Sequence, residues 1–364
     1  MAADKFIGIM SGTSADAADA VVVEFPATAD ASTLRLLGSA SIAFPAALSA
    51  EIIALNSCSH NELARSRALG VKIARLYAES AQQALQQAGV TPQQITACAV
   101  HGQTLRHQPY EGYSIQVVEL PLLAELLGTA VIGDFRGRDL AAGGQGAPLA
   151  CGFHNWYFRQ RPCAVLNLGG FANLTILRQD QPVLGCDCGP ANVLMDAWAQ
   201  KHLGKPFDPY GRWAASGECN QELLHRLQLH PFFSRSLPRS TGRDDFHLDW
   251  LMAQQLDDLA PNDVQATLLA LTSWCIATTL REFEPFSRLY ACGGGVNNPV
   301  LQQAIADATG MELLASDNAG VPARWMEAIA FAWLGWRHLD GLPGNLASVT
   351  GAQSERVLGC YYPA

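Results

Sequence analysis

Two short apolar segments in the middle of the chain are joined by a double glycine. Ala164–Leu168 has the composition of a buried strand, Gly169 and Gly170 make a tight turn, and Asn173–Leu177 follows as the return strand. A second glycine-bearing turn comes next and holds Asp187. Because glycine lets backbone N–H groups approach an anion without a Cβ in the way, this stretch predicts an anion site with a lone carboxylate beside it.

Pro190 suits the first turn of a helix that runs through Asn192 and Leu194, so the positive end of that helix would point at the same anion. Two simpler interpretations stay open on these residues alone. Asp187 could cap the helix, and the double glycine could mark an ordinary hairpin. A second copy of the pattern favours the anion site.

That second copy lies at the start of the chain. Phe6–Met10 is a predicted strand, Ser11–Ser14 a turn of small residues, and Ala20–Phe25 the return strand. Two such hairpins, about 160 residues apart, each open an α/β segment and so indicate duplicated halves. We therefore predict an α/β fold of two domains, with duplicated mixed β-sheets flanked by helices and a central cleft. With 364 residues, 49% of them hydrophobic, the chain is long enough for two cores.

The first hairpin carries polar groups that suit a phosphate. Gly12, Thr13 and Ser14 offer amides and hydroxyls, and Asp16 or Asp19 is able to hold Mg²⁺ through water. A solvated hairpin tip is the alternative, because the same residue types build plain turns.

Charge and cysteine content exclude several classes of partner. A net charge of −9 argues against nucleic acid or an anionic membrane as the main partner. The ten cysteines lack the paired spacing of zinc sites or of a compact disulfide framework, which indicates free thiols in a reducing cytosol. The densest apolar run, Ala328–Trp336, stops at Arg337 and is far shorter than the ~18 residues of a membrane span. We therefore expect a cytoplasmic protein.

His101 and Gln103 follow the predicted strand Ile95–Val100 directly, and open α/β sheets bind polar ligands just past such strand ends. A hydrogen-bonded structural histidine is the alternative. Because no carboxylate lies at ligand spacing, we expect no metal at this point.

A triple glycine follows the predicted strand Leu289–Cys292, which comes after a long apolar helix, Val264–Phe283, capped by Asn262 or Asp263. Gly293, Gly294 and Gly295 would let a flat base or a phosphate lie against the backbone, with Asn297 as a hydrogen-bonding end.

Residues 134–150, DFRGRDLAAGGQGAPLA, are rich in glycine and charge and predict a loop, either a mobile connector or part of the cleft wall. Arg136 and Arg138 suit a carboxylate or a phosphate, and an interdomain salt bridge with Asp134 or Asp139 is the alternative. We place the domain boundary at this loop. Domain I then comprises residues 1–133 and 338–364, and domain II residues 134–337.

Two further segments bear on a ligand site. The predicted helix Arg324–Arg337, which should return to the first half, contains one acid, Glu327. A buried lone carboxylate is costly unless it has a partner or a function, whereas the helix dipole is the simpler explanation. In the loop His230–Phe246, residues 239–242 could line the substrate side, although basic surface loops are common.

Eight stretches of the sequence resemble signature stretches of the bacterial anhydro-N-acetylmuramic acid kinases, within the sugar kinase, Hsp70 and actin superfamily. They are GIMSGTSADAADA, AVHGQTLRHQP, GDFRGRDLAAGGQGAPL, NLGGFANLT, GCDCGPANVLMDAW, PRSTGRDDF, ACGGGVNNP and MEAIAFAWL. The resemblance runs from about Phe6 to Thr350, nearly the whole chain.

The resemblance implies an ATP-dependent enzyme that opens the 1,6-anhydro ring of 1,6-anhydro-N-acetylmuramic acid with water. It phosphorylates the freed O6, giving N-acetylmuramic acid 6-phosphate and ADP in peptidoglycan recycling. Asp187 is then the base that activates water, and a homodimer is favoured. The implied ATP contacts are Gly12, Thr13, Ser14, Ala15, Asp16, Ala17, Ala18, Asp19, Asn167, Gly169, Gly170, Asn173, Gly293, Gly294, Gly295 and Asn297. The implied substrate contacts are Ser11, His101, Gln103, Arg136 and Glu327, with Mg²⁺ held by Asp16 and Asp19 through water.

This chemistry requires few protein groups. Attack of water on the anomeric carbon needs one positioned carboxylate, as in inverting glycosidases. The γ-phosphoryl group of ATP captures the leaving O6, so a second carboxyl group becomes dispensable. Phosphoryl transfer itself needs mainly alignment and Mg²⁺.

The sequence departs from the family pattern in two places. Ala17 replaces a usual glycine and fits if its φ is negative, and Cys186 and Cys188 stand where Phe and Thr are usual. Cys188 removes a hydroxyl next to Asp187 and so alters the expected hydrogen bonding there. We expect activity to survive, because Asp187 and the adjoining Gly-Pro are kept.

Two other functions remain open. A kinase for a smaller anhydro sugar such as levoglucosan would need no cation for a lactyl carboxylate, for which Arg136 is the candidate. The other is an ATP- or sugar-binding regulator without turnover. Related repressors carry an added helix-turn-helix before the first strand, and we expect none here because that strand is predicted from Phe6.

Overall fold

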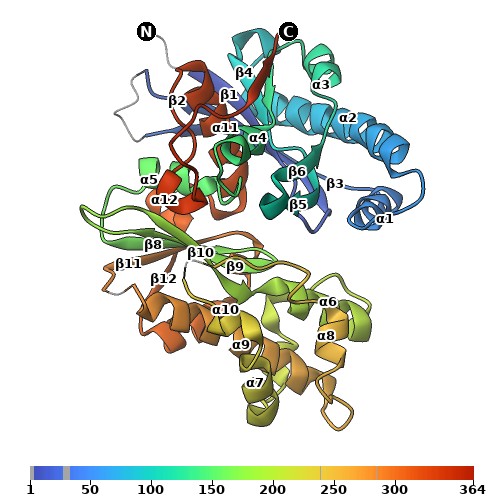
Figure 1. Ribbon diagram of the computed structural model, residues 1–364, viewed down its shortest axis with the longest axis vertical. Coiled ribbons are helices and arrows are strands. Elements are labelled where there is room, and N and C mark those ends of the chain that lie inside the picture. The colour runs from blue at the N-terminus through green and yellow to red at the C-terminus, as the bar shows by residue number, and fades with distance from the viewer. Residues whose placement is uncertain (1–3, 28–32, 238, 284) are drawn as a thin grey trace. The chain divides into compact units, whose positions relative to one another are not determined.

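The computed structural model describes residues 4–27, 33–237, 239–283 and 285–364 (Figure 1). The chain divides into two compact units: unit 1 comprises Met1–Arg159 and Trp325–Ala364, and unit 2 comprises Gln160–Arg324. Residues 1–3 and 28–32 of the predicted domain I, and Pro238 of one signature stretch, lie outside the described residues.

Unit 1 is built on a mixed sheet with the strand order β13-β7-β4-β1-β2-β3. β1, β2 and β3 pair antiparallel, whereas β4 runs parallel to β1, and β7 parallel to β4. A separate hairpin pairs β5 with β6. The strands are β1 (Asp4–Met10), β2 (Ala17–Phe25), β3 (Arg35–Ala43), β4 (Ala97–Val100), β5 (Gln103–Gln108), β6 (Tyr113–Val117), β7 (Val131–Gly133) and β13 (Cys360–Tyr362).

Unit 2 repeats this arrangement with the order β10-β9-β8-β11-β12. Here β8, β9 and β10 are antiparallel, and β11 and β12 continue parallel to β8. The strands are β8 (Cys163–Leu168), β9 (Phe171–Leu177), β10 (Leu184–Pro190), β11 (Arg288–Cys292) and β12 (Leu313–Ala315). The shared order confirms the predicted two-domain α/β fold with duplicated mixed sheets, while the cleft stays a prediction.

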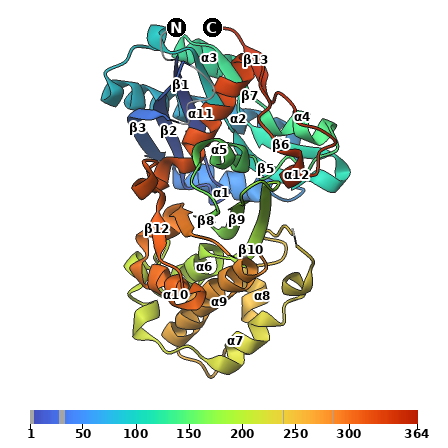
Figure 2. The ribbon, with the colours of Figure 1, turned by 90° about the vertical axis from the view of Figure 1, so that its left-hand side faces the viewer.

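Two long helices cover the sheet of unit 1 (Figures 1 and 2). Ile7 and Ile9 face the core that contains α2 (Glu62–Ala88), whereas Gly8, between them, faces α11 (Met326–Leu339). A Cβ on Gly8 would lie 2.1 Å from the Ala328 carbonyl oxygen, so glycine is what lets α11 approach the strand. The other α-helices of unit 1 are α1 (Ala46–Leu55), α3 (Leu120–Leu127), α4 (Phe135–Ala141), α5 (Ala150–Tyr157) and α12 (Ala347–Thr350).

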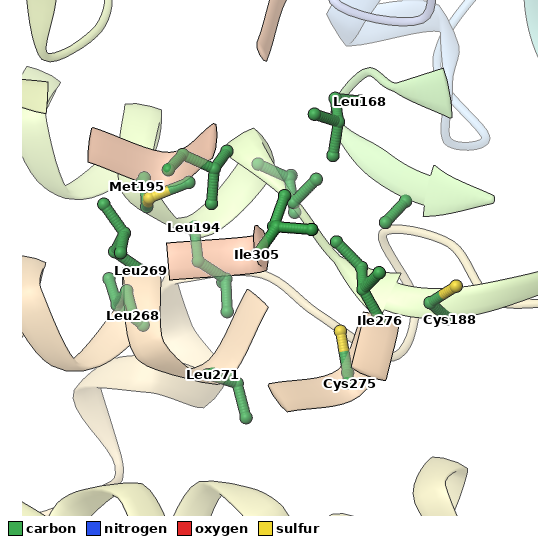
Figure 3. Packing of buried hydrophobic residues seen from close by; sticks show 14 of the residues in the cluster. Leu168, Cys188, Leu194, Met195, Leu268, Leu269, Leu271, Cys275, Ile276 and Ile305 are labelled. Carbon is green, nitrogen blue, oxygen red and sulfur yellow. The ribbon is translucent and has the colours of Figure 1, made fainter. Parts of the chain in front are cut away.

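The core of unit 2 lies between its sheet and the helices α6 (Asn192–Leu203), α9 (Pro261–Arg281) and α10 (Pro299–Thr309). Figure 3 shows Leu168 and Cys188 of the sheet packed with Cys275 and Ile276 of α9 in one apolar layer. The remaining helices of unit 2 are α7 (Gln221–Gln228) and α8 (Leu248–Met252). Short 3₁₀ turns are η1 (Pro92–Gln94), η2 (Pro109–Glu111), η3 (Pro209–Gly211), η4 (Ala214–Ser216), η5 (Pro231–Ser234), η6 (Gly294–Asn297), η7 (Ser316–Ala319) and η8 (Ala323–Trp325). Within the described ranges, every helix is too short or too polar to traverse a bilayer.

The glycine-rich stretch that predicted a loop begins instead with α4. Asp134 caps this helix by accepting a hydrogen bond from the Gly137 amide, and Phe135 is buried beneath it. A cap and one buried aromatic residue thus outweigh the low helix propensity of glycine. The predicted ion pairs of Arg136 or Arg138 with Asp134 or Asp139 do not form among the described residues.

Asp139 explains why the unit boundary differs from the predicted one at residue 134. Its buried carboxylate accepts hydrogen bonds from Asn345 Nδ2 at 2.6 Å, Thr350 Oγ1 at 2.7 Å and the Gly146 amide at 2.7 Å. These bonds join the α4 region to the end of the chain. Residues 134–159 and 325–337 therefore belong to unit 1, although the sequence placed them in the second domain.

Two predicted helix starts are wrong. Pro190 ends strand β10, and α6 starts two residues later, at Asn192. α9 begins at Pro261 rather than after a cap at Asn262 or Asp263. At α9 the proline lacks an N–H and has a helical φ, so it suits the first helical position and moves the start upstream. Pro190 instead pairs with Phe171 in the sheet, which delays the start of α6.

We predict that Asp139→Ala lowers the free energy of unfolding by about 3 kcal/mol, because three donors lose their buried acceptor. Asp134→Ala, which removes only the exposed cap of α4, should cost about 1 kcal/mol. Denaturant unfolding of both variants measures this difference. Equal, small losses would show that Asp139 does not hold the chain end to α4.

Candidate active site

Three polar residues lie side by side across the antiparallel strands of unit 2. Asn167 of β8 pairs with Asn173 of β9, which pairs in turn with Asp187 of β10. Each stands between two apolar residues whose side chains enter the core, so the polar side chains share the opposite face. We call these three residues the polar row. Asp187 was predicted in a turn, but strand pairing places it within β10 beside a bulge at Gly189.

Cys186 and Cys188 flank Asp187 and are buried in the apolar core of unit 2. Figure 3 shows Cys188 there, close to Cys275 and Ile276. Burial raises the pKa of the Cys188 thiol well above its usual value, so this thiol stays neutral. The two cysteines that depart from the family pattern therefore lie mainly on the core side of the strand. The hydrogen bond on the Asp187 carboxylate comes from elsewhere.

The segment 239–245 binds Asp187 twice. The Asp187 amide donates to the Arg239 carbonyl oxygen at 2.9 Å, and the Thr241 amide donates to Asp187 Oδ2 at 2.9 Å. Burial raises the pKa of Asp187 to about 6, although the bond from Thr241 and the charge of Arg239 act to lower it. A carboxylate with this pKa is ionised at neutral pH and accepts a proton readily, which suits a general base.

The glycine turns of unit 2 lie next to the polar row. Asn192 Nδ2 donates to the carbonyl oxygens of Leu168 and Gly169, at 3.2 and 2.7 Å, which fixes the hairpin turn against the start of α6. The triple glycine lies beside the same hairpin, because a Cβ on Gly293 would be 2.4 Å from Asn167 Oδ1. Asn297, at the end of η6, donates to the Gly294 carbonyl oxygen at 3.3 Å.

These glycines differ in whether the fold requires them. Gly293 has a φ of 85°, and a Cβ on Gly295 would lie 2.7 Å from Leu168 Cβ. At Gly169, Gly170 and Gly294, in contrast, φ is not positive and an added Cβ would approach no atom closer than 3.7 Å. Within the described residues, neither a steric clash nor the backbone conformation therefore requires glycine at these three positions.

In unit 1, the turn of the first hairpin is fixed by a buried network. Ser11 Oγ shares a hydrogen bond with the Tyr77 hydroxyl and donates to Gln103 Oε1 at 2.8 Å. Gln103 Nε2 donates to the Gly12 carbonyl oxygen at 3.2 Å. Two residues predicted on the substrate side, Ser11 and Gln103, thus lie together and support the turn at Gly12.

A second cluster in unit 1 joins His101 to Arg136. The Arg136 Nε and Nη2 atoms lie 3.1 and 2.8 Å from His101 Nε2, and Nη1 donates to the Gly146 carbonyl oxygen at 2.7 Å. Burial and the charge of Arg136 lower the pKa of His101 well below its usual range, so the ring is neutral and accepts through Nε2. Burial lowers the pKa of Arg136 to about 10, although the charges of Glu327 and Asp139 act to raise it. The predicted residues His101, Arg136 and Glu327 therefore share one electrostatic environment.

The predicted metal residues occupy different settings in unit 1. Asp16 lies exposed in the turn and accepts from Ser14 Oγ at 2.8 Å, whereas Asp19 lies in β2 opposite Met10. Ala17 and Ala18 also belong to β2, and Ala17 is not among the residues with positive φ, so its side chain fits. Ala15 is the residue of this turn with a positive φ, 55°. In the described chain no group of three metal-ligating side chains occurs, which leaves water to complete any coordination shell.

Sequence reasoning missed two of the groups that build these sites. Thr241 was considered only for the substrate side, whereas its amide binds Asp187, and Tyr77, whose hydroxyl bonds Ser11, was not considered. A backbone amide leaves no signal in the side-chain pattern. The buried hydroxyl of Tyr77 needed a partner, and this requirement was the available signal.

A family model described as anhydro-N-acetylmuramic acid kinase matches residues 4–364. The chain belongs to this family. A relative of that name from Bordetella pertussis (strain Tohama I) is 48% identical over 366 residues, covering 99% of this chain and 96% of the relative. The kinase of that name from Chromobacterium violaceum is 44% identical over 368 residues, with 99% of both chains covered.

Solved structures aligned with this family member share little sequence with it. The activator of the 2-hydroxyisocaproyl-CoA dehydratase from Clostridium difficile is 12% identical, with a TM-score of 0.47 and coverage of 90% of this chain and 92% of that chain. A ROK family glucokinase from Streptomyces griseus is 13% identical, with a TM-score of 0.42 and coverage of 91% and 98%. The strand order shared by its two units defines the fold of this kinase family member.

We predict that Asp187→Asn stabilises this kinase family member above pH 6. The folded-state pKa of about 6 exceeds the ordinary value of 3.8, so the carboxyl group adds most stability when protonated and loses it as the pH rises from about 4 to 6. The ionised form then costs on the order of 2–3 kcal/mol, which asparagine avoids. Thermal unfolding at pH 8 should show a higher midpoint for the variant, and the gap should close below pH 4.

Asp245 serves as the matched control. Burial acts to raise the pKa of Asp245, but bonds from Arg235 and Thr241 outweigh it and lower the pKa, so Asp245→Asn should destabilise at neutral pH. Identical pH profiles for wild type and Asp187→Asn would show that Asp187 is fully solvated.

Proposed function

We propose that this protein phosphorylates 1,6-anhydro-N-acetylmuramic acid with ATP, opening the anhydro ring with water to give N-acetylmuramic acid 6-phosphate and ADP. The observation that carries the proposal is the setting of Asp187: a single carboxylate at the end of the polar row, held by the Thr241 amide, with a pKa of about 6. Membership of the kinase family supports the same reaction.

Asp187 is the proposed base. It takes a proton from water as the oxygen attacks the anomeric carbon, and the C1–O6 bond breaks. The departing O6 forms a bond to the γ-phosphorus of ATP, and ADP leaves. Because the phosphoryl group captures O6, no second carboxyl group is needed to protonate it.

The glycines without a structural role support nucleotide binding in unit 2. Gly169, Gly170 and Gly294 have room for a side chain within the chain itself, so the reason for glycine there is a ligand that approaches the backbone. A Cβ on Gly169 would lie 3.9 Å from Asn167 Nδ2, and one on Gly293, which precedes Gly294, would lie 2.4 Å from Asn167 Oδ1, so both glycine turns lie beside the polar row.

The first hairpin is the proposed phosphate loop of unit 1. The network of Ser11, Tyr77 and Gln103 holds the turn at Gly12, and Asp16 and Asp19 supply the hard oxygen ligands that Mg²⁺ prefers, through water. Mg²⁺ would neutralise phosphate charge there. Arg136 is the proposed contact for the lactyl carboxylate, since its bonds to His101 and Gly146 use three of its five N–H groups.

The setting of this reaction is part of the same proposal. Its product would enter peptidoglycan recycling. The expected cytoplasmic location rests on the unpaired spacing of the cysteines and the short apolar runs, and the homodimer rests on the resemblance to the family. Sedimentation of the purified protein tests the dimer directly.

We predict that turnover in ¹⁸O-labelled water with ATP and Mg²⁺ places the label at C1 of a 6-phosphorylated product. Mass spectrometry of the product and its fragments locates the label. Asp187→Asn should abolish turnover while ATP binding persists, because only the base is lost. Levoglucosan in place of the muramic acid derivative is the control for sugar specificity. Consumption of ATP without label at C1 would contradict the proposal.

We predict that Gly294→Ala raises the KM for ATP about tenfold, a loss of about 1.4 kcal/mol, without lowering the unfolding temperature. Gly295→Ala is the matched variant one residue away, and it should lower the unfolding temperature because its Cβ would meet Leu168. Calorimetry of ATP binding and thermal unfolding separate the two effects. Normal ATP binding by Gly294→Ala would remove the triple glycine from the nucleotide site.

A further inference from the structure

Arg239 carries a positive charge that no acidic group of the described chain neutralises directly. Its Nη1 donates to the Phe233 carbonyl oxygen at 2.8 Å, and its Nη2 lies 3.4 Å from Thr279 Oγ1. The guanidinium carbon lies 4.5 Å from the centre of the Phe232 ring. These partners are neutral, and Arg239 Nε is buried without a hydrogen-bond partner among the described residues.

This cation lies in the segment that holds Asp187. The Arg239 carbonyl oxygen accepts from the Asp187 amide, and two residues later the Thr241 amide donates to the Asp187 carboxylate. Thr241 is braced in turn, because its hydroxyl donates to Asp245 Oδ2 at 2.9 Å and Asp245 pairs with Arg235 at 2.7 Å. One short segment therefore supplies both the orientation of the Asp187 carboxylate and a nearby positive charge.

We propose that Arg239 is a positioning residue for the reaction: its fixed, unneutralised charge keeps the Asp187 carboxylate ionised while the Thr241 amide orients it. This inference rests on the proposed role of Asp187 as the base. Arg239 itself touches neither sugar nor nucleotide in this account. Its aromatic and carbonyl partners hold the guanidinium group in place without cancelling its charge.

The balance of interactions around Asp187 gives the direction of the effect. Burial raises the pKa of Asp187, and the Thr241 bond and the Arg239 charge oppose this rise. The Cys188 thiol also interacts with Asp187, but it stays neutral because burial raises its pKa. Without the Arg239 charge, burial would raise the pKa of Asp187 further, so Asp187 would bind a proton at higher pH.

The experiment compares pH profiles of kcat/KM for Arg239→Met, Arg239→Lys and Arg212→Met in the full-length protein. Arg212 is the control because its guanidinium also lies over an aromatic ring, 5.3 Å from the centre of the Tyr210 ring, but outside the segment that holds Asp187. We expect the acidic limb to move up by about half a pH unit or more in Arg239→Met, with the larger activity loss below pH 7. Arg239→Lys should restore the limb, and Arg212→Met should not move it.

A second readout measures the same coupling without turnover. The stabilisation by Asp187→Asn grows from the unfolded-state pKa of 3.8 and levels off above the folded-state pKa of Asp187, so thermal unfolding of single and double variants reports that folded-state pKa. In the Arg239→Met background the stabilisation should level off at a higher pH and reach a larger value. If the protein fails to phosphorylate the anhydro sugar, the proposed function falls, but this measurement still tests the coupling.

The inference would be overturned if the acidic limb stays in place and the stabilisation by Asp187→Asn levels off at the same pH with and without Arg239. An even loss of kcat at every pH in Arg239→Met would then assign Arg239 a purely structural role in the segment.

Discussion

The antiparallel pairing of β8, β9 and β10 is the constraint on which the site of unit 2 depends. Because side chains alternate across a sheet, this register puts Leu166, Leu168 and Cys186 into the core while Asn167 and Asp187 share the other face. A slip by one residue would turn the carboxylate into the apolar core and the core residues to the opposite face of the sheet. The hydrophobic core of unit 2 thus fixes the position of the proposed base.

The same strand order in unit 1 serves a different purpose. There the hairpin turn is longer, and hydrogen bonds among Ser11, Tyr77 and Gln103 fix its position. Asp19 lies in β2, the strand that pairs with β1. In the proposed function the two copies of one architecture present different chemistry: backbone amides for phosphate and the Asp16 and Asp19 carboxylates for Mg²⁺ in unit 1, and a lone base in unit 2.

The buried charged groups of Arg136, Asp139 and Arg239 differ in their hydrogen-bond partners. Asp139 is fully satisfied by three donors and serves the fold. Arg136 shares its bonds between a neutral histidine and a carbonyl oxygen, and Arg239 lies among neutral partners. A cation without a direct counter-ion is costly for stability but leaves its field available to a nearby carboxylate or ligand.

The sequence by itself determined the elements with strong local signals. Glycine turns between short apolar runs predicted both hairpins, whereas the role of Asp187 as the base came from the resemblance to the family. Tertiary structure alone decided that Asp187 lies in a strand, that α4 belongs to unit 1, and that the Thr241 amide binds the carboxylate. The first outcome depends on the pairing of Asp187 with Asn173, and the other two depend on hydrogen bonds between residues about 50 to 200 positions apart, for which local propensity carries no signal.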